Sequence, residues 1–401
     1  MISVGIDISK EKSMVCILRP YGEVIASPYE IAHTEEDLKI LVKKIRSLKG
    51  EVRVIMEATG TYHLPVLMSL KQSGIFVSVI NPLLMKKYAS AAIRKGKTDK
   101  LDSVRIANYG IDNWFHLIDY KPLENTYQEL KLLGRQYFHY IKLKINSKLA
   151  LTHMLDQTMP GIKNILNGKR SDNPMRDKLT DFVEEYWHYD IITKKSESQF
   201  ILSYCKWAKK KGYHASESKA KSIYSLARNG IPTLSSSTPS TKMLVLEAAR
   251  VLREICRTLQ NILTQMKMIA TNLKEYEIVR SMQGVGEILA MRLIAEIGDV
   301  RRFHSSSALI AYTGIDSPPY ESGNFIGTKR GISKRGSALL RKTGYEVMKS
   351  IKVVKPKEDA AVYQYMLKKE SEGKPKKVAK IAALNKFLRI YYARVMEVYQ
   401  S

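Results

Sequence analysis

The sequence predicts an α/β domain at the N-terminus, a long helical middle region and a mainly α-helical C-terminal domain. In the first part of the chain, short apolar runs alternate with segments of helical period. Further on, apolar residues recur every three or four positions over two long stretches. After residue 281, Gly- and Pro-containing turns separate shorter helical segments. We therefore expect domains at residues 1–115, 116–281 and 282–401, with an insertion at about 162–240.

The first domain reads as three strands followed by alternating helices and strands. The strands are expected at residues 2–6, 13–18, 23–27, 51–56 and 75–80, and the helices at 35–48, 62–72 and 99–109. Early hairpins favour antiparallel pairing, and later crossovers favour parallel pairing. This is the order of an RNase H-like sheet, in which the first strand lies centrally beside the strand that follows the first helix.

Four carboxylates occupy positions that such a sheet would bring together. Asp7 ends the first strand and Glu57 ends the fourth, while Asp99 and Asp102 would share one face at the start of a helix. Four close negative charges cannot all stay ionised without a cation. Mg²⁺ or Mn²⁺ prefers oxygen ligands, and two such ions about 4 Å apart would activate a nucleophile and stabilise a leaving oxygen. Taken singly, these acids also suit a strand end or the first turn of a helix.

The charge balance indicates a polyanionic partner. The chain carries a formal net charge of +27 over 401 residues. No apolar run of about 18 residues and no signal peptide is evident, so we expect no membrane partner. Three widely spaced cysteines suit a reducing cytoplasm, where the protein would associate with the nucleoid. The expected nucleic-acid contacts are Arg94, Lys95, Lys97, Lys100, Lys329, Arg330, Lys334, Arg335 and Arg341.

Two long helical patterns dominate the middle region. One covers residues 125–158, and the other places apolar residues at alternating spacings of four and three from Ala248 to Leu273. The second pattern is typical of a coiled-coil seam. Its partner is either the first helix in the same chain or the same helix in a second chain, and we favour a role in a dimer. Between the two, residues 162–240 predict an inserted, mainly helical segment.

The C-terminal region offers a candidate nucleophile. A Gly-x-Gly turn at 284–286 leads into an apolar helix, as in helix-hairpin-helix modules that hold a DNA phosphate. A long loop rich in Pro and Gly then carries Ser322, followed by a stretch of basic residues. A serine there is either part of a surface turn or a nucleophile brought to a phosphodiester, and as a nucleophile it would need a base or a metal to activate it.

These motifs together resemble a known family. The N-terminal segments VGIDISK, VIMEATGTY and KTDKLDSVRIA resemble the DEDD, RuvC-like domain of IS110-family insertion-sequence transposases. The segments MQGVGEILAMRLIAEIGDVRRF, AYTGIDSPPYESG and GISKRGSALLRK resemble the C-terminal transposase domain of that family. The resemblance covers roughly residues 1–115 and 279–350, and residues 160–240 exceed the more compact members.

The resemblance implies a mechanism and partners. Asp7, Glu57, Asp99 and Asp102 would be the metal-binding carboxylates. Ser322 would attack DNA and form a transient phosphoserine link, with Ser317 and Ser333 as fallback candidates. A structured bridge RNA would pair with donor and target DNA. The chains would assemble from homodimer to homotetramer, with the RuvC-like domain of one subunit completing the site of another.

Two other functions remain open on the sequence. One is a RuvC-like or RNase H-like structure-specific endonuclease that uses activated water and no serine. The other is a catalytically silent nucleic-acid-binding scaffold. The Ser322→Ala variant separates the first from a recombinase, and replacement of Asp7 separates the second.

Overall fold

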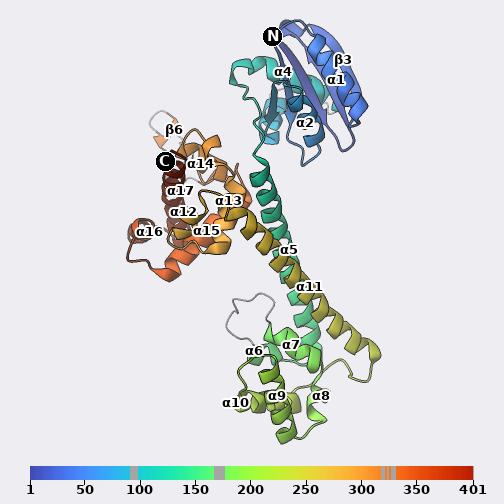
Figure 1. Ribbon diagram of the computed structural model, residues 1–401, viewed down its shortest axis with the longest axis vertical. Coiled ribbons are helices and arrows are strands. Elements are labelled where there is room, and N and C mark those ends of the chain that lie inside the picture. The colour runs from blue at the N-terminus through green and yellow to red at the C-terminus, as the bar shows by residue number, and fades with distance from the viewer. Residues whose placement is uncertain (91–97, 167–176, 318–320, 323–324, 327–330, 401) are drawn as a thin grey trace. The chain divides into compact units, whose positions relative to one another are not determined.

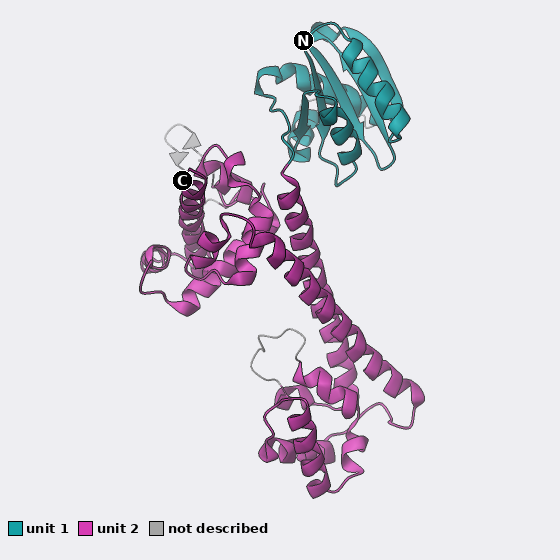
Figure 2. Ribbon diagram, in the orientation of Figure 1, with its two compact units in different colours: residues 1–122 teal, residues 123–401 magenta. Residues whose placement is uncertain are grey.

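The computed structural model describes residues 1–90, 98–166, 177–317, 321–322, 325–326 and 331–400. The chain forms two compact units, Met1–Pro122 and Leu123–Ser401 (Figure 2). The first unit extends past residue 115 because Asp119 accepts hydrogen bonds from Lys71 Nζ at 2.7 Å and from the Val77 amide at 3.0 Å. In the described residues, no helix is long and apolar enough to cross a bilayer.

The first unit is built on a five-stranded sheet. Its strands are β1 (Ile2–Ile8), β2 (Lys12–Leu18), β3 (Val24–Ala32), β4 (Val52–Glu57) and β5 (Val77–Ile80), in the order β3-β2-β1-β4-β5 (Figure 1). The β1–β2 and β2–β3 pairs are antiparallel, whereas β1–β4 and β4–β5 are parallel. The central position of β1 and the mixed pairing confirm the predicted RNase H-like order.

Helices cover both faces of this sheet because successive strand residues point to opposite sides. Val4 and Ile6 of β1 lie in a core with residues of α1 (Glu35–Ser47) and α2 (Leu64–Gln72). The other face meets α4 (Asp99–Asp112), where Cys16 and Leu18 pack against Ala107. Each face of β1 therefore has its own helical cover.

Contact between β1 and α4 is close because β1 carries small residues on that face. A Cβ atom on Gly5 would lie 2.3 Å from the Ala107 nitrogen and 2.4 Å from the Ser103 oxygen. Ser3 Oγ donates a hydrogen bond of 2.7 Å to the Ala107 carbonyl. On the helix side, a Cβ on Gly110 would meet Ser3 Oγ at 2.3 Å. Only residues of this size let the two backbones approach so closely.

One helix of the first unit was not predicted. No helix is predicted between the strand at 75–80 and the helix at 99–109, but Pro82 begins α3 (Pro82–Ser90). The Asn81 side chain accepts a hydrogen bond of 2.9 Å from the Leu83 amide, which satisfies a free donor at the helix start. Proline is suited to the first position of a helix because its missing N–H would have no partner there.

The second unit is organised by two long helices, α5 (Asn125–Thr158) and α11 (Pro239–Ala270), which lie side by side (Figure 1). This pairing is within one chain, which was one of the two expected arrangements. The buried stripe of α11 differs in part from the predicted seam. Leu252, Leu259 and Met266 are buried as expected. The intervening buried positions are Ala249, Cys256 and Ala270, each one residue later than predicted.

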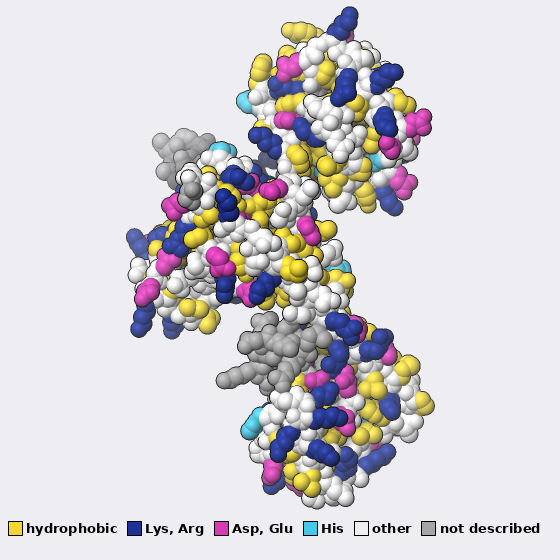
Figure 3. All heavy atoms as spheres, in the orientation of Figure 1, with side chains coloured by type: hydrophobic (Ala, Val, Ile, Leu, Met, Phe, Trp, Pro, Cys, Tyr) yellow, Lys and Arg dark blue, Asp and Glu magenta, His cyan; other side chains and the backbone are white. Residues whose placement is uncertain are grey.

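The insertion between these helices is helical, as predicted. It contains α6 (Ile162–Leu166), α7 (Lys178–Glu185), α8 (Tyr189–Thr193), α9 (Glu197–Lys210) and α10 (Glu217–Asn229). Its core is aromatic: Phe182 packs against Tyr186, Tyr204 and Trp207 at ring-centroid distances of 4.9, 6.2 and 5.6 Å. Basic side chains are spread over the face of this insertion that Figure 3 shows.

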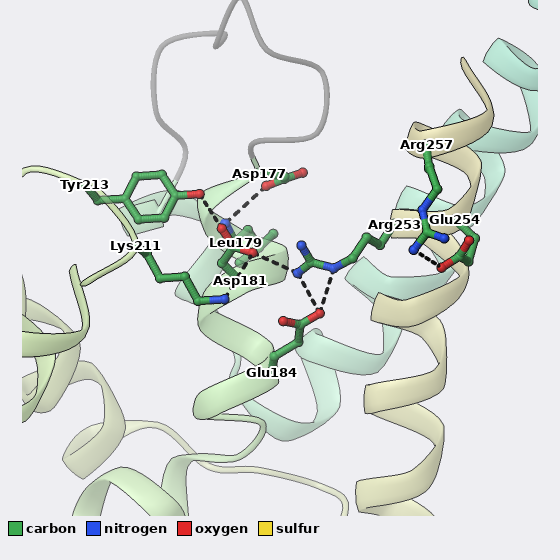
Figure 4. A network of polar contacts seen from close by, with 9 residues as sticks. All are labelled: Asp177, Leu179, Asp181, Glu184, Lys211, Tyr213, Arg253, Glu254 and Arg257. Carbon is green, nitrogen blue, oxygen red and sulfur yellow. Dashed lines mark hydrogen bonds and ion pairs between the residues drawn. The ribbon is translucent and has the colours of Figure 1, made fainter. Parts of the chain in front are cut away.

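A polar network joins the insertion to α11 (Figure 4). Arg253 of α11 donates to Asp181 at 2.7 Å and to Glu184 at 2.8 Å, both on α7. Asp181 also accepts a hydrogen bond of 2.5 Å from the Tyr213 hydroxyl. Because the side chain of Asp181 is only 9% exposed, its charge depends on these partners.

The C-terminal part of the second unit is a helical domain. It contains α12 (Tyr276–Ser281), α13 (Glu287–Ile297), α14 (Ser306–Thr313), α15 (Ala338–Val354), α16 (Ala361–Ser371) and α17 (Lys376–Gln400). The predicted Gly-x-Gly turn links α12 to α13. Gly284 has φ +76°, and a Cβ there would meet Ile351 Cγ1 at 2.4 Å. This glycine therefore serves packing against α15.

A buried carboxylate ties the helical domain to α5. Glu275 is 1% exposed and accepts hydrogen bonds from Tyr127 at 2.7 Å and Tyr399 at 2.5 Å. Burial raises the pKa of Tyr399 to about 12, and its hydrogen bond to Glu275 acts in the same direction. Both tyrosines therefore remain protonated donors at neutral pH. The start of α5, the start of α12 and the end of α17 are held at one point.

We expect Gly5→Ala to destabilise the first unit by about 3 kcal/mol, because a methyl group would be forced against backbone atoms of α4 that cannot rotate away. Ser3→Ala is the matched control on the same strand and face. It removes one hydrogen bond and should cost about 1 kcal/mol. Thermal unfolding and hydrogen exchange of α4 measure both effects. Equal exchange in α4 for the two variants would show that close approach at Gly5 is not required.

Replacement of Arg253 with Ala should loosen the insertion by about 1.5–3 kcal/mol, because Asp181 loses a charged hydrogen-bond donor. The control is Arg257→Ala on the same helix. Arg257 forms an exposed pair with Glu254 at 2.9 Å, worth about 0.3–0.5 kcal/mol. Hydrogen exchange of α7 gives the readout. If the α7 amides are equally protected from exchange in both variants, Arg253 does not anchor the insertion.

Candidate functional site

Two of the predicted carboxylates lie on neighbouring parallel strands. Asp7 is on β1 and Glu57 ends β4. Ile6 pairs with Met56, so Asp7 and Glu57 occupy the next position of the same ladder. Residues opposite one another in a ladder share a face, and this face also carries Gly5 and Ile55. Asp7 and Glu57 therefore belong to the face that α4 covers.

The other two carboxylates lie in the first turn of α4. Thr98 begins the helix, and its side chain accepts a hydrogen bond of 3.2 Å from the Leu101 amide. Along β1, Ser3 lies against Ala107, and Gly5 lies against Ser103. The helix therefore runs opposite to the strand. Its first turn, with Asp99 and Asp102, is directed toward the end of β1 that carries Asp7.

Electrostatic contacts agree with this direction. Lys12 begins β2, and its carbonyl accepts a hydrogen bond from Ser9 just after β1. The pKa of Lys12 is raised, chiefly by its hydrogen bond to Glu30 and by the charge of Glu30, with a smaller contribution from Asp99. Asp102 pairs with Arg105 at 2.7 Å, and its side chain is 26% exposed. Asp99 is exposed.

This donor set suits a divalent metal by its chemistry, because all four groups supply hard carboxylate oxygens. Within the described part of the chain, no three His, Cys, Asp or Glu side chains are gathered in a metal-binding group. Asp102 instead directs one oxygen to Arg105. The first turn of α4 is thus directed toward the strand ends that carry Asp7 and Glu57, and Asp102 in that turn pairs with Arg105.

His63, on the segment that follows Glu57, was not among the predicted site residues. It is 8% exposed, and burial lowers its pKa, with an opposing contribution from a hydrogen bond to the Thr59 backbone. It is therefore neutral at physiological pH. The only signal in the sequence was its place shortly after a strand that ends on an acid. The contribution of Lys12 could not be predicted, because it depends on the β1–β2 turn.

Ser322 lies on a short hairpin in the second unit. It ends β6 (Glu321–Ser322), which pairs antiparallel with β7 (Phe325–Ile326). The sequence predicts only a long loop here, so the two short strands are a correction. Glu321 pairs with Ile326 and Ser322 pairs with Phe325.

The base of the Ser322 loop is closed by pairs of backbone hydrogen bonds. The Ser333 amide donates to Asp316 at 2.8 Å, and the Lys334 amide donates to Gly314 at 3.0 Å. Gly336 packs so closely that a Cβ there would lie 1.9 Å from the Tyr312 carbonyl oxygen. The two ends of the loop are thus held together, and Ser322 lies between these ends along the chain.

The two fallback serines serve this base. Ser333 Oγ donates to Asp316 at 2.5 Å, and Ser317 Oγ donates to the Gly331 carbonyl at 3.3 Å. Both hydroxyls therefore hold the loop closed. Of the three candidate serines, Ser322 is the farthest along the chain from the loop base.

Glu296, which was not predicted, contacts Ser337 beside the same loop base. It is 2% exposed and accepts a hydrogen bond of 2.9 Å from Ser337 Oγ, at the start of α15. Arg135 Nε lies 3.6 Å from its other oxygen. A buried acid in an apolar helix was the available signal, since such groups need partners.

The predicted nucleic-acid contacts fall into three groups. Lys100, Lys334 and Arg335 are exposed, and none forms an ion pair with a described residue. Arg341 is half-buried and donates to the Thr313 and Gly336 carbonyls at 2.9 and 3.3 Å, so it holds the loop base. The remaining predicted contacts lie outside the described residues; they are Arg94, Lys95, Lys97, Lys329 and Arg330.

Comparison with known proteins yields two family matches. Residues 4–160 match a DEDD transposase model of the IS110 type. Residues 276–364 match the model described as transposase of the IS116/IS110/IS902 family. The first match contains all four carboxylates, and the second contains Ser322.

Three curated proteins are similar to this chain in sequence. A transposase for insertion sequence element IS1111A from Coxiella burnetii is 36% identical over 77 residues, which cover 19% of this chain and 21% of that protein. A pilin gene-inverting protein from Moraxella bovis is 21% identical over 98% of this chain and 95% of its own length. An IS116 protein from Streptomyces clavuligerus is 21% identical over 81% of this chain and 78% of its own.

Among solved structures, Thermus thermophilus RuvC aligns with a TM-score of 0.22 at 13% identity, over 27% of this chain and 90% of that chain. The RNase H-like assignment rests on the observed strand order. Two consecutive domain matches, in the order in which the motifs occur, agree on one family, and two of the curated relatives are also proteins of insertion sequence elements. The chain therefore belongs to the IS110 family of insertion-sequence transposases.

Proposed function

We propose that this transposase cuts and rejoins DNA through a metal-bound carboxylate site and a serine nucleophile. The observation that carries the proposal is the placement of Asp7 and Glu57 on one face of adjacent strands, with the first turn of α4 directed toward them. Nucleases and recombinases use such carboxylates to hold divalent cations at a phosphodiester.

The proposed residue roles are those that the family resemblance implies. Asp7, Glu57, Asp99 and Asp102 hold Mg²⁺ or Mn²⁺, which would supply charge stabilisation at the scissile phosphate. The Ser322 hydroxyl attacks phosphorus and gives up its proton, the bond to one sugar oxygen breaks, and that oxygen leaves as a hydroxyl. The phosphoserine link conserves the ester bond, so a second DNA hydroxyl can reverse the reaction and join a new strand.

We also propose that donor and target DNA are selected by a structured bridge RNA, in a homodimer or homotetramer. Support comes from the family match and from the net charge of +27, which suits extended polyanions. Exposed Lys334 and Arg335 beside the loop base offer contacts to a phosphate backbone. If RNA selects the DNA, the purified chain should exchange strands only when this RNA is present.

We expect Ser322→Ala to abolish strand exchange and the covalent DNA–protein adduct, at least about a thousandfold below the native rate, because no other hydroxyl replaces the nucleophile. The assay uses a labelled DNA that carries the ends of the encoding element, together with RNA transcribed from its non-coding part. Denaturing gels separate the adduct from free DNA. The matched control is Ser222→Ala, an exposed serine on α10, which should retain full activity.

Asp7→Asn keeps the shape of the side chain and removes its charge. It should abolish metal-dependent activity while DNA binding persists, because backbone contacts do not need the metal site. If Ser322→Ala still cuts DNA and only Asp7→Asn fails, the protein is an endonuclease that uses activated water. If neither substitution changes any activity, the carboxylates are not catalytic and the scaffold reading is correct.

A further inference from the structure

A basic groove lies between α1 and α2, on the covered face of the sheet opposite to α4. It has a volume of about 380 Å³ and is lined by Lys39, Val42, Lys43, Arg46, Ser69 and Ser73. We call this the α1–α2 groove. One wall is a line of cations on α1, and the other wall carries two serines from α2 and its end. None of these residues belongs to the proposed carboxylate site.

The cations follow one stripe of α1. Lys39, Lys43 and Arg46 are spaced by four and three residues, which places them on the same side of the helix. At a rise of about 1.5 Å per residue, the stripe is about 10 Å long. One strand of a duplex carries a phosphate every 3.4 Å or so of helix axis. The stripe thus spans about three phosphates.

These cations are available to a ligand to different degrees. Lys44, which points out of the stripe, lies over the Tyr29 ring at 3.8 Å. Lys39 pairs with Glu35 at 2.6 Å, but its side chain remains 74% exposed. Lys43 forms no ion pair with any described residue. A surface pair such as Lys39–Glu35 contributes little and is readily exchanged for a phosphate contact.

Arg46 joins the two walls, since its Nη2 donates a hydrogen bond of 2.6 Å to the Ser73 carbonyl. This contact fixes the width of the groove and keeps a guanidinium at its end. The attraction of basic residues to a helix C-terminus explains why α1 ends with positive charges. It does not explain the hollow or the hydroxyl groups of Ser69 and Ser73, which are donors suited to phosphate oxygens.

We propose that the α1–α2 groove binds the sugar–phosphate backbone of a nucleic acid. The site is open, its charges form a line, and most of them are lysines, which act as point charges toward phosphate oxygens. The bound strand would lie on the face of the domain opposite to the carboxylates. The same domain would then bind one nucleic-acid segment at the carboxylates, where it reacts. It would bind a second segment in the α1–α2 groove, which holds that segment in the complex.

The test measures how binding of the full-length chain depends on salt. Probes are single-stranded and duplex DNA and single-stranded and hairpin RNA, each followed by fluorescence anisotropy. The double variant Lys39→Gln/Lys43→Gln should make the negative slope of log K against log salt shallower, because two phosphate contacts are lost. The expected change is about 1.8 for a duplex and about 1.4 for a single strand. The probe class that shows the change identifies DNA or RNA as the bound strand.

The matched control is Lys49→Gln/Lys121→Gln, which removes two exposed lysines of the same unit outside the groove lining. It reproduces the change in net charge and should leave the slope unaltered. Unfolding temperatures of both variants confirm that the fold is kept, and Lys43→Gln alone should give half the effect. The proposal is overturned if the groove variant and the control have the same slope with all four probes.

This test is independent of the proposed chemistry. The groove variant is assessed by binding alone, and Asp7→Asn should show the same slope as the native chain. Loss of strand exchange in Asp7→Asn with an intact slope leaves the groove proposal standing. A changed slope in the groove variant, with an inactive native chain, would support the groove even if the transposition assay fails.

Discussion

The first unit depends on one steric constraint, the near-contact of the β1 and α4 backbones at Gly5. A Cβ atom there would overlap the helix backbone at 2.3 Å, so no other residue allows this approach. The constraint does more than fill a core. It fixes how far along the strand the helix lies, and so where Asp99 and Asp102 are presented relative to Asp7 and Glu57. A packing contact in the middle of the sheet thus determines the geometry at its edge.

The charges near this contact differ in sign from those of the chain as a whole. Carboxylates collect at one end of β1 and β4 although the chain as a whole carries +27. Such a concentration costs free energy unless a cation or a basic neighbour offsets it. Lys12 and Arg105 supply part of that compensation through Asp99 and Asp102. If the proposed metal site forms, Asp102 would have to exchange its contact with Arg105 for the ion.

The strand order and the ladder position of Asp7 and Glu57 could be predicted, because hairpins and crossovers are encoded locally by turns and apolar periods. The buried stripe of α11 could not be predicted fully. Ala249, Cys256 and Ala270 are small and weakly apolar, whereas the adjacent Ile255 and Ile269 dominate the pattern without being fully buried. The closed base of the Ser322 loop was also missed, because it depends on hydrogen bonds between segments about 20 residues apart.

The chain enters and leaves the helical insertion at the same end of the α5–α11 pair. The amides of Thr233 and Leu234 both donate to the Gln157 carbonyl, at 2.9 and 3.2 Å, so the returning chain is fastened where α5 ends. The paired helices therefore need only a short connection at this point, and the extra helices are an elaboration of it. A change in the length of this insertion would therefore leave the pairing of α5 with α11 unaltered, because both of its ends are fixed at Gln157.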